Sequence, residues 1–364
     1  MIHLQLNAPA MRRISLLIAL GALVALPLSL IVALVYSLST GTASPPRHMS
    51  VSRKAPVPAV VRWQPTTLKL QTDALGIDPA RPDQLYAGTP GGLWQSGDAG
   101  ATWTRATVIA APPEFLSFAA GTVDDQLYAG ASDGTLFARD PVNGAWRRIV
   151  RSLDGSSVFS LACVPGPTPT LLAGTSNGIY RVVHAGGSWR VTRVAGTGGS
   201  SVTSILVLPW KPKVIFASIF GSRPPVLRSG DGGLRWHAFM QGLPSSLPSE
   251  QLIAVAALSK SVILSSMGVG VWQFTPGHGW SEISAGLPER HAMPLAVDAN
   301  GVRLYAGTMG SGVYTRTASS PWRRLGTQLV GPAYIDLGLQ VAGPRGGYLV
   351  VGTSQGVYRR ALGG

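Results

Sequence analysis

Residues 75–103 read LGIDPARPDQLYAGTPGGLWQSGDAGATW, and this stretch decides the fold. Short apolar segments alternate in it with clusters of Gly, Pro and Asp, the residues that tight turns require. The predicted strands are 75–77, 85–87, 93–94 and a last one at Trp103, with a turn over 78–83 between the first two. Four short strands joined in this way predict one antiparallel meander. Such a sheet cannot bury both of its faces alone, so it requires copies of itself as neighbours.

The copies are present along the rest of the chain. The segment Tyr86-Ala87-Gly88 recurs at nearly regular steps as Tyr128-Ala129-Gly130, Leu172-Ala173-Gly174, Phe216-Ala217-Ser218, Leu264-Ser265-Ser266, Tyr305-Ala306-Gly307 and Val350-Val351-Gly352. A Trp follows each of the first six copies: Trp103, Trp146, Trp189, Trp236, Trp280 and Trp322. A period of about 40–50 residues with four strands per unit is typical of a β-propeller. We therefore predict an all-β chain with seven four-stranded antiparallel blades.

The two ends of the repeat predict how the ring closes. The seventh unit ends at Gly364 without a Trp of its own, whereas Trp63 lies upstream of the first unit, one repeat period before Trp103. We predict that residues 60–64 supply the missing outer strand of the last blade. A ring closed by both chain ends has no open edge, which would otherwise favour aggregation.

Composition agrees with one turn-rich domain that has a basic surface. The 364 residues include 45 Gly and 28 Pro, and 45% of the residues are hydrophobic, which excludes a disordered chain. The formal net charge is +14, from 30 Lys and Arg against 16 Asp and Glu. A basic surface attracts nucleic acid, anionic lipid or an acidic protein, or it is simply solvated. No nucleic-acid motif is present, so we expect no nucleic-acid partner.

The start of the chain differs from the propeller that we assign to residues 60–364. After a short segment, 1–13, residues 14–38 carry no charge at any position, and 39–59 form a Pro- and Ser-rich linker. A span of that length crosses a bilayer with some tilt, so Ile14 to Leu38 is expected to be a transmembrane anchor. A cleaved signal peptide, with Gly41-Thr42-Ala43 near its cleavage site, is the alternative. Arg12-Arg13 before the span favours a cytoplasmic N-terminus and a propeller outside the membrane.

One local pattern occurs twice in phase with the Trp period. The form S-x-D-x-G-x-x-W is carried by Ser96, Asp98, Gly100 and Trp103, and again by Ser229, Asp231, Gly233 and Trp236. An Asp side chain can cap the backbone N–H groups of a tight turn, and Gly accepts the positive φ that such a turn requires. The Trp is expected to pack this hairpin against the next blade. The pattern therefore indicates a structural role for all eight residues.

This pattern resembles the Asp-box of sialidase-type (BNR) repeats. The order of Asp78-Pro79, the Tyr86 segment, Gly92-Leu93-Trp94 and the box is similar to that in YCF48-like photosystem II assembly propellers, sortilin-type receptors and xyloglucanases. The resemblance covers residues 60–364 and is strong in the first unit. It implies a propeller whose boxes lie away from the binding face. A sialidase would carry an Arg-Ile-Pro motif, which is absent, and a xyloglucanase uses two propellers, whereas this chain has one.

We interpret the chain as a membrane-anchored, non-catalytic scaffold that binds a protein partner, with an acidic partner favoured by the charge. A carbohydrate-active hydrolase, sialidase- or xyloglucanase-like, is the alternative on the same fold. Hydrolysis of a glycoside requires two carboxyl groups about 5–9.5 Å apart, and the sequence offers no clear pair on one face. The His residues show no metal-ligand spacing, so no metal and no cofactor are expected.

The binding face is predicted on the rim opposite the boxes. Turns between second and third strands share that rim with the connections between blades, and both vary from blade to blade. The candidate residues are Asp133, Asn177, Arg223, Glu250, Glu289, Arg290, His291 and Gln355. Arg223 and Arg290 are the expected anchors, because arginine suits bidentate recognition of carboxylates. The outer wall, with the pairs Arg147-Arg148 and Arg323-Arg324, is the alternative docking surface.

Overall fold

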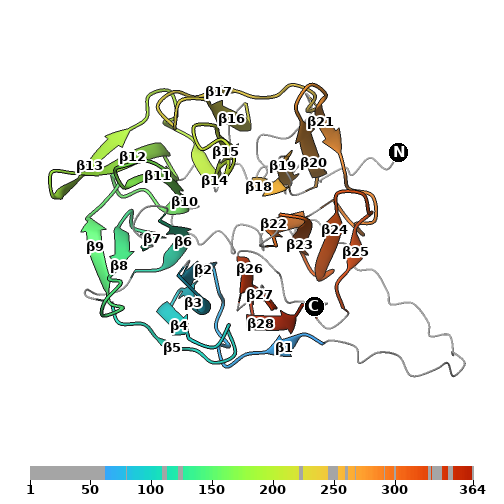
Figure 1. The fold of residues 1–364 in the computed structure, drawn as a ribbon, viewed down its shortest axis with the longest axis horizontal. Coiled ribbons are helices and arrows are strands. Elements are labelled where there is room, and N and C mark those ends of the chain that lie inside the picture. Colours follow the sequence, from blue (N-terminus) through green and yellow to red (C-terminus); the bar gives the residue numbers. More distant parts are fainter. Residues whose placement is uncertain are drawn as a thin grey trace, which may run out of the picture.

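The computed structural model shows seven four-stranded antiparallel sheets arranged in a ring (Figure 1). It describes residues 62–78, 80–108, 113–121, 126–220, 224–244, 253–258, 261–266, 268–290, 292–298, 301–326, 329, 338–342 and 347–362. The prediction of an all-β, seven-bladed propeller is confirmed. The proposed anchor and linker lie outside the described residues, and within the described part no helix is long and apolar enough to cross a membrane.

Each blade runs from its innermost strand at the centre to its outermost strand on the wall. The strands of blades 1 to 3 are β2 (Ala74–Asp78), β3 (Arg81–Thr89), β4 (Gly92–Ser96), β5 (Thr104–Arg105); β6 (Phe115–Ala120), β7 (Leu127–Ala131), β8 (Leu136–Arg139), β9 (Trp146–Val150); and β10 (Val158–Val164), β11 (Thr170–Thr175), β12 (Gly178–Ala185), β13 (Ser188–Arg193).

The remaining blades repeat the same order. They contain β14 (Ser201–Val207), β15 (Ile215–Phe220), β16 (Val226–Ser229), β17 (His237–Ala238); β18 (Ile253–Leu258), β19 (Ser261–Ser266), β20 (Gly270–Thr275), β21 (Gly279–Glu282); β22 (Ala292–Val297), β23 (Arg303–Thr308), β24 (Val313–Thr317), β25 (Arg323–Arg324); and β26 (Gly338–Ala342), β27 (Tyr348–Thr353), β28 (Gly356–Ala361) with β1 (Gln64–Pro65).

The second strand of each blade explains the recurring segment. In β3, Leu85, Tyr86 and Ala87 are completely buried, because both faces of the strand are covered by neighbouring blades. The following Gly88 packs so closely against the next blade that an added β-carbon would collide with the backbone oxygen of Phe115. The repeat therefore requires an apolar pair followed by a residue with almost no side chain.

One turn is shorter than predicted. The expected turn over 78–83 is wrong, because β3 begins at Arg81 and pairs with Asp78 across a bulge. The Asp78 carboxylate tightens the turn by accepting hydrogen bonds from the Ala80 amide at 3.0 Å and from the Arg81 guanidinium at 2.9 Å. The sequence pattern did not reveal that the side chain of Asp78 closes this turn.

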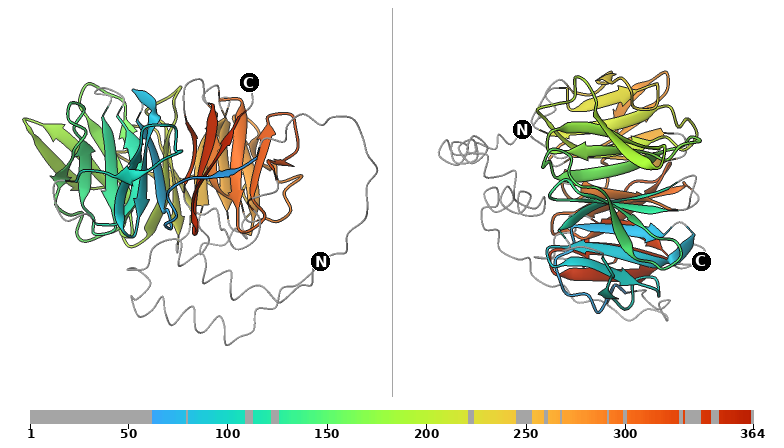
Figure 2. Two further views of the ribbon diagram at one scale, coloured as in Figure 1. Left: turned by 90° about the horizontal axis from the view of Figure 1, so that it is seen from below. Right: turned by 90° about the vertical axis from the view of Figure 1, so that its left-hand side faces the viewer.

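The start of the described chain lies beside its end. Strand β1 pairs antiparallel with β28, with Gln64 opposite Arg359, along the outer side of the last blade (Figures 1 and 2). Trp63 is buried between the last two blades, and its indole Nε1 donates a hydrogen bond to the Leu325 oxygen at 2.8 Å. Residues 60 and 61 of the predicted closing segment lie outside the described part, so closure by the whole segment stays a prediction.

Candidate functional site

The predicted rim is represented by five described residues. Asp133, Asn177 and Gln355 lie in turns between second and third strands, and Glu289 and Arg290 lie in the connection between blades 5 and 6. In an antiparallel meander these positions share one end of the strands with the start of each innermost strand. The other three candidates, Arg223, Glu250 and His291, lie outside the described residues.

The side chains at two of these positions accept hydrogen bonds from nearby groups of the protein. The Asp133 carboxylate accepts a hydrogen bond from the Thr135 amide at 2.9 Å. The Asn177 oxygen accepts hydrogen bonds from the Arg193 guanidinium at 2.8 Å and from the Gly199 amide at 2.9 Å. Asn177 therefore joins the rim to the outer wall of its own blade, because Arg193 belongs to β13.

The arginine expected to anchor a partner is already engaged. Arg290 forms an ion pair with Glu282 at 2.8 Å, and its guanidinium donates to the Val269 oxygen at 3.2 Å. The Arg290 carbonyl also accepts hydrogen bonds from the Gly268 and Gly270 amides. A ligand carboxylate would have to displace Glu282 before it could pair with this guanidinium.

The two S-x-D-x-G-x-x-W turns lie on the opposite rim, between third and fourth strands. The Asp98 carboxylate accepts hydrogen bonds from the Ala101 and Thr102 amides, both at 2.9 Å. The Ser96 hydroxyl donates to Asp98 and accepts from the Gly100 amide at 3.0 Å. Ser229, Asp231 and Gly233 repeat these contacts at nearly the same distances. The carboxylate of each aspartate is thus directed into its own turn.

These hydrogen bonds set the protonation of the turn aspartates. Burial would raise the pKa of Asp98, but hydrogen bonds from the Thr102 side chain and amide and from Ser96 outweigh it and lower that pKa. The pKa of Asp231 is lowered in the same way, by the Arg235 amide and Ser229 against the effect of burial. Both carboxylates are therefore held in the charged form that caps the turn.

The tryptophan of each turn faces the preceding blade, not the next one as expected, and the glycine of the turn packs against the same preceding blade. A β-carbon at Gly100 would contact Val350 of blade 7, and Trp103 packs in the same cluster as Val350 and Val357. Gly233 and Trp236 meet Leu172 of blade 3 in the same way. The direction follows from the handedness of the ring, which a local pattern does not contain.

The structure brings together two carboxyl groups that the sequence analysis did not connect. Asp73 and Glu114 each precede the innermost strand of their blade, and a side-chain hydrogen bond links them across the boundary of blades 1 and 2. Asp73 is 3% exposed. Burial, followed by the charge of Asp73 and this hydrogen bond, raises the pKa of Glu114 to about 7. The sequence feature that could have predicted this contact is the equivalent position of the two residues, directly before β2 and β6.

This carboxyl pair differs from the pair that hydrolyses glycosides. Hydrogen-bonded carboxyl groups touch, whereas glycosidases hold theirs at least about 5 Å apart to admit the sugar or a water molecule. Two carboxyl groups in contact share one proton, because both cannot ionise easily at that distance. Burial and the neighbouring Asp73 therefore favour the protonated form of Glu114 at this boundary between two blades.

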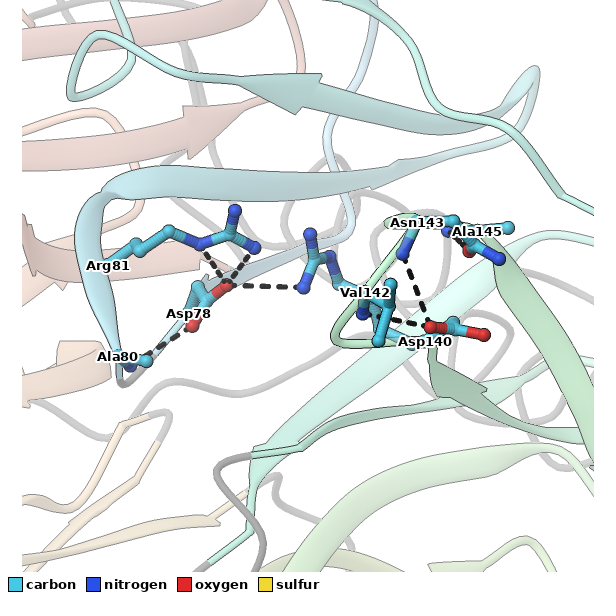
Figure 3. A network of polar contacts seen from close by, with 8 residues as sticks. Asp78, Ala80, Arg81, Asp140, Val142, Asn143 and Ala145 are labelled. Carbon is cyan, nitrogen blue, oxygen red and sulfur yellow. Dashed lines mark hydrogen bonds and ion pairs between the residues drawn. The ribbon is translucent and has the colours of Figure 1, made fainter.

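An ion network joins the same two blades at the opposite end of their strands. Figure 3 shows the Asp78 carboxylate bonded to Ala80 and Arg81, and the Asp140 carboxylate bonded to the Val142 and Asn143 amides. Asp78 also lies 3.4 Å from the guanidinium of Arg139 in blade 2. These groups are paired within the protein, so the network holds blades together.

Two hollows with charged side chains lie on the wall of blades 2 and 3. A pocket of about 420 Å³ between these blades is lined by His184 and Trp189, whose ring centroids are 4.9 Å apart, and by Arg147 across from them. A second hollow, of about 530 Å³, is lined by Arg147, Arg148, Ile149 and Arg151. Within the described ranges no three His, Cys, Asp or Glu side chains gather as metal ligands.

Comparison with known proteins identifies the fold. No protein-family model and no curated protein matches the chain. YCF48 bound to a D1 peptide superposes with a TM-score of 0.63 at 12% identity, over 86% of this chain and 100% of that one. The GH74 xyloglucanase from Xanthomonas campestris gives a TM-score of 0.64 at 18% identity, over 83% of this chain and 54% of that one.

A third neighbour is an extracellular domain. That domain, from a hybrid two-component system of B. thetaiotaomicron, gives a TM-score of 0.62 at 16% identity over 82% of this chain. This chain spans 39% of its length. At these identities the similarity shows a β-propeller and leaves the activity open, since unrelated functions share this fold.

Proposed function

We propose that the chain is a membrane-anchored, non-catalytic propeller that binds an acidic protein partner at the wall of blades 2 and 3. The observation that carries this proposal is the set of exposed arginines there whose charge is not balanced. Residues 126–200 contain seven Arg and three Asp, with no Lys or Glu. Arginine recognises carboxylates with two parallel hydrogen bonds, which lysine cannot do.

The contacts of these arginines support a free docking surface. Arg147 pairs with Asp140 at 2.9 Å. Arg148, Arg151 and Arg190 are exposed, and none of them forms an ion pair with another described residue. Unpaired exposed guanidinium groups keep their full attraction for an approaching acidic surface.

The proposed surface continues onto the predicted rim. Arg193 on the wall donates to Asn177 in the rim turn, so the two regions are contiguous at blade 3. We retain Asp133, Asn177, Arg223, Glu250, Glu289, Arg290, His291 and Gln355 as candidate rim contacts, and the two Asp-box turns as structural elements of the far rim. Because Arg290 already pairs with Glu282, the wall arginines replace it as the main anchors.

A structural neighbour gives independent support for protein binding. The structure of YCF48 is one of a propeller bound to a D1 peptide, and its fold covers 86% of this chain. The xyloglucanase neighbour would favour the hydrolase alternative, but the touching carboxyl groups of Asp73 and Glu114 lack the spacing that glycoside hydrolysis needs. Binding is therefore the function that the described residues support best.

The test is capture of the partner from detergent-solubilised membranes by the full-length protein. Replacement of Arg148, Arg151 and Arg190 with Ala should lower capture about tenfold and leave the melting temperature unchanged, because all three side chains are exposed. Replacement of Arg323 and Arg324, exposed on β25 of blade 6, is the matched control and should leave capture intact. Equal losses in both variants would show that general charge, not this surface, binds the partner.

Anchoring is a separate part of the proposal. Residues 14–38 form a continuous uncharged run that is long enough to span a bilayer. Protease added to spheroplasts should then digest the propeller and leave a small membrane-bound fragment. Complete protection of the propeller would reverse the orientation, and soluble protein beginning near Ser44 would show that a signal peptide had been cleaved.

A further inference from the structure

Strand β13 (Ser188–Arg193) differs from the other outermost strands. It contains six residues, whereas β1, β5, β17 and β25 contain two each. In Figure 1 it lies on the outside of the ring, beyond β12. It pairs with β12 on one side, and no strand of the described chain pairs with its other side. β13 is thus the longest outer strand in the described part.

The turn before β13 determines which backbone groups face outward. Gly186 and Gly187 have φ values of 61° and 75°, as a two-residue type I′ hairpin requires. In such a hairpin Ala185 and Ser188 form a hydrogen-bonded pair, and such pairs then alternate along the ladder. The Val194 amide donates to the Ile179 oxygen at 2.8 Å, in agreement with this alternation.

It follows that alternate residues of β13 present free backbone groups. The amides and carbonyls of Trp189, Val191 and Arg193 point away from β12, whereas those of Arg190 and Thr192 bond to it. No described group bonds to the outward set. These three residues offer the row of donors and acceptors that an added strand requires.

The neighbouring long outer strand is already partly covered. The first residue of β9, Trp146, donates its amide to the Thr107 oxygen at 3.0 Å and forms a parallel bridge with Val108. The connection from blade 1 thus occupies the start of that edge. No segment in the described ranges covers the outer edge of β13 in this way. β13 is therefore the better edge for the addition of a further strand.

The side chains around this edge indicate the chemistry of the added strand. Val191, at the middle of the outward set, is 42% exposed and offers an apolar contact. Arg190 is exposed on the other face of β13, and Arg147 lines the same pocket as Trp189. A strand laid along β13 would have arginines near both of its faces.

We propose that an extended acidic segment of the partner adds to β13 as a fifth strand of blade 3. This inference rests on the proposed function and specifies how the partner binds. A six-residue edge takes a segment about 20 Å long at about 3.3 Å per residue. Backbone hydrogen bonds to Trp189, Val191 and Arg193 supply affinity, while carboxylates facing the arginines select acidic segments and exclude basic ones.

The first experiment uses the full-length protein in detergent and a capped peptide of about eight alternating Thr and Glu residues. Backbone amide exchange is measured with and without the peptide. The amides of Trp189, Val191 and Arg193 should become protected, whereas those of Arg190 and Thr192 are already protected by β12. A twin peptide with Lys in place of Glu should give no protection. Binding of the acidic peptide without protection of the outward amides would overturn the proposal.

The second experiment uses a matched pair of variants at the middle of the edge. Val191→Pro removes the outward amide and leaves the hydrogen bonds to β12. It should therefore lower the affinity for the acidic peptide about tenfold. Val191→Thr keeps that amide and should change affinity less than about twofold. Equal affinity of both variants would also overturn the proposal. If Val191→Pro fails to fold, the proposal is judged by the amide exchange of the wild-type protein with and without the acidic peptide.

The outcomes separate this inference from the function on which it rests. Partner capture that depends on Arg148, Arg151 and Arg190, together with unprotected edge amides, refutes strand addition and leaves the binding function standing. A wild-type protein that captures no specific partner, or that captures it equally well after replacement of Arg148, Arg151 and Arg190, refutes the function itself.

Discussion

Asp78 at the end of β2 and Arg139 at the end of β8 form a buried ion pair between blades 1 and 2, with 3.4 Å between Oδ2 and Nη1. The two side chains are 3% and 10% exposed. Because Arg139 is buried, its charge depends on Asp78 for compensation, whereas Asp78 is also bound by the more exposed Arg81.

Replacement of Asp78 with Ala should therefore lower the free energy of unfolding by about 3–5 kcal/mol, the cost of leaving a buried charge without its partner. Chemical denaturation measures this loss. Arg81→Ala is the control, because Arg81 binds the same carboxylate but is 51% exposed, and it should cost less than about 1 kcal/mol. Similar losses in both variants would contradict an essential role of the buried pair.

The Asp73–Glu114 contact predicts a pH dependence of stability. The pKa of Glu114 is raised from 4.5 to about 7 in the folded chain. Folding therefore favours the protonated form, and the contribution is complete below about pH 4.5 and is lost as the pH rises through about 7. Since Glu114 is only half-buried, we expect an effect of about 1–2 kcal/mol.

Glu114→Gln should remove this dependence, because its amide cannot ionise. Melting temperatures of the variant and the wild-type protein, compared between pH 4.5 and 7.5, isolate the effect from other titrating groups. Glu282→Gln, at an exposed carboxylate paired with Arg290, is the control. Its melting temperature should change with pH as that of the wild-type protein does. The expectation fails if Glu114→Gln and the wild-type protein lose stability in parallel.

The Asp98 turn should contribute to stability and not to binding. Asp98→Ala removes the acceptor for the Ala101 and Thr102 amides and should lower the free energy of unfolding by about 1–2 kcal/mol. Asp231→Ala should behave alike, and the two losses should add because the turns lie in different blades. Partner capture should be unchanged in both variants. Loss of capture without loss of stability would instead place these carboxylates in a binding site.

Ring closure is testable by deletion. Removal of residues 58–66 takes away Trp63 and β1 and leaves β28 with an unpaired edge, so the melting temperature should fall by at least about 3 °C. Removal of an equally long linker segment, residues 48–56, is the control and should leave melting unchanged. An unchanged melting curve in the first variant would be evidence against closure by this segment.

Much of the fold could be predicted because its determinants are local. The repeat of an apolar pair followed by Gly reports a strand buried on both faces and a close approach by the next blade, as Gly88 shows against Phe115. The Asp98 turn is closed by groups within four residues of the aspartate. Such features depend on short-range sequence, so a pattern of residue types suffices to identify them.

The contacts at the candidate sites were decided by the tertiary structure. Asp73 meets Glu114, and Asp78 meets Arg139, only because the ring sets one blade against the next. Arg290 forms an ion pair with Glu282, a partner that its place in the repeat did not indicate. The open edge of β13 depends on what the connections of other blades cover. Periodicity specifies the position of a residue within its blade, but its charged neighbours and exposure come from packing between blades, which a repeat pattern does not encode.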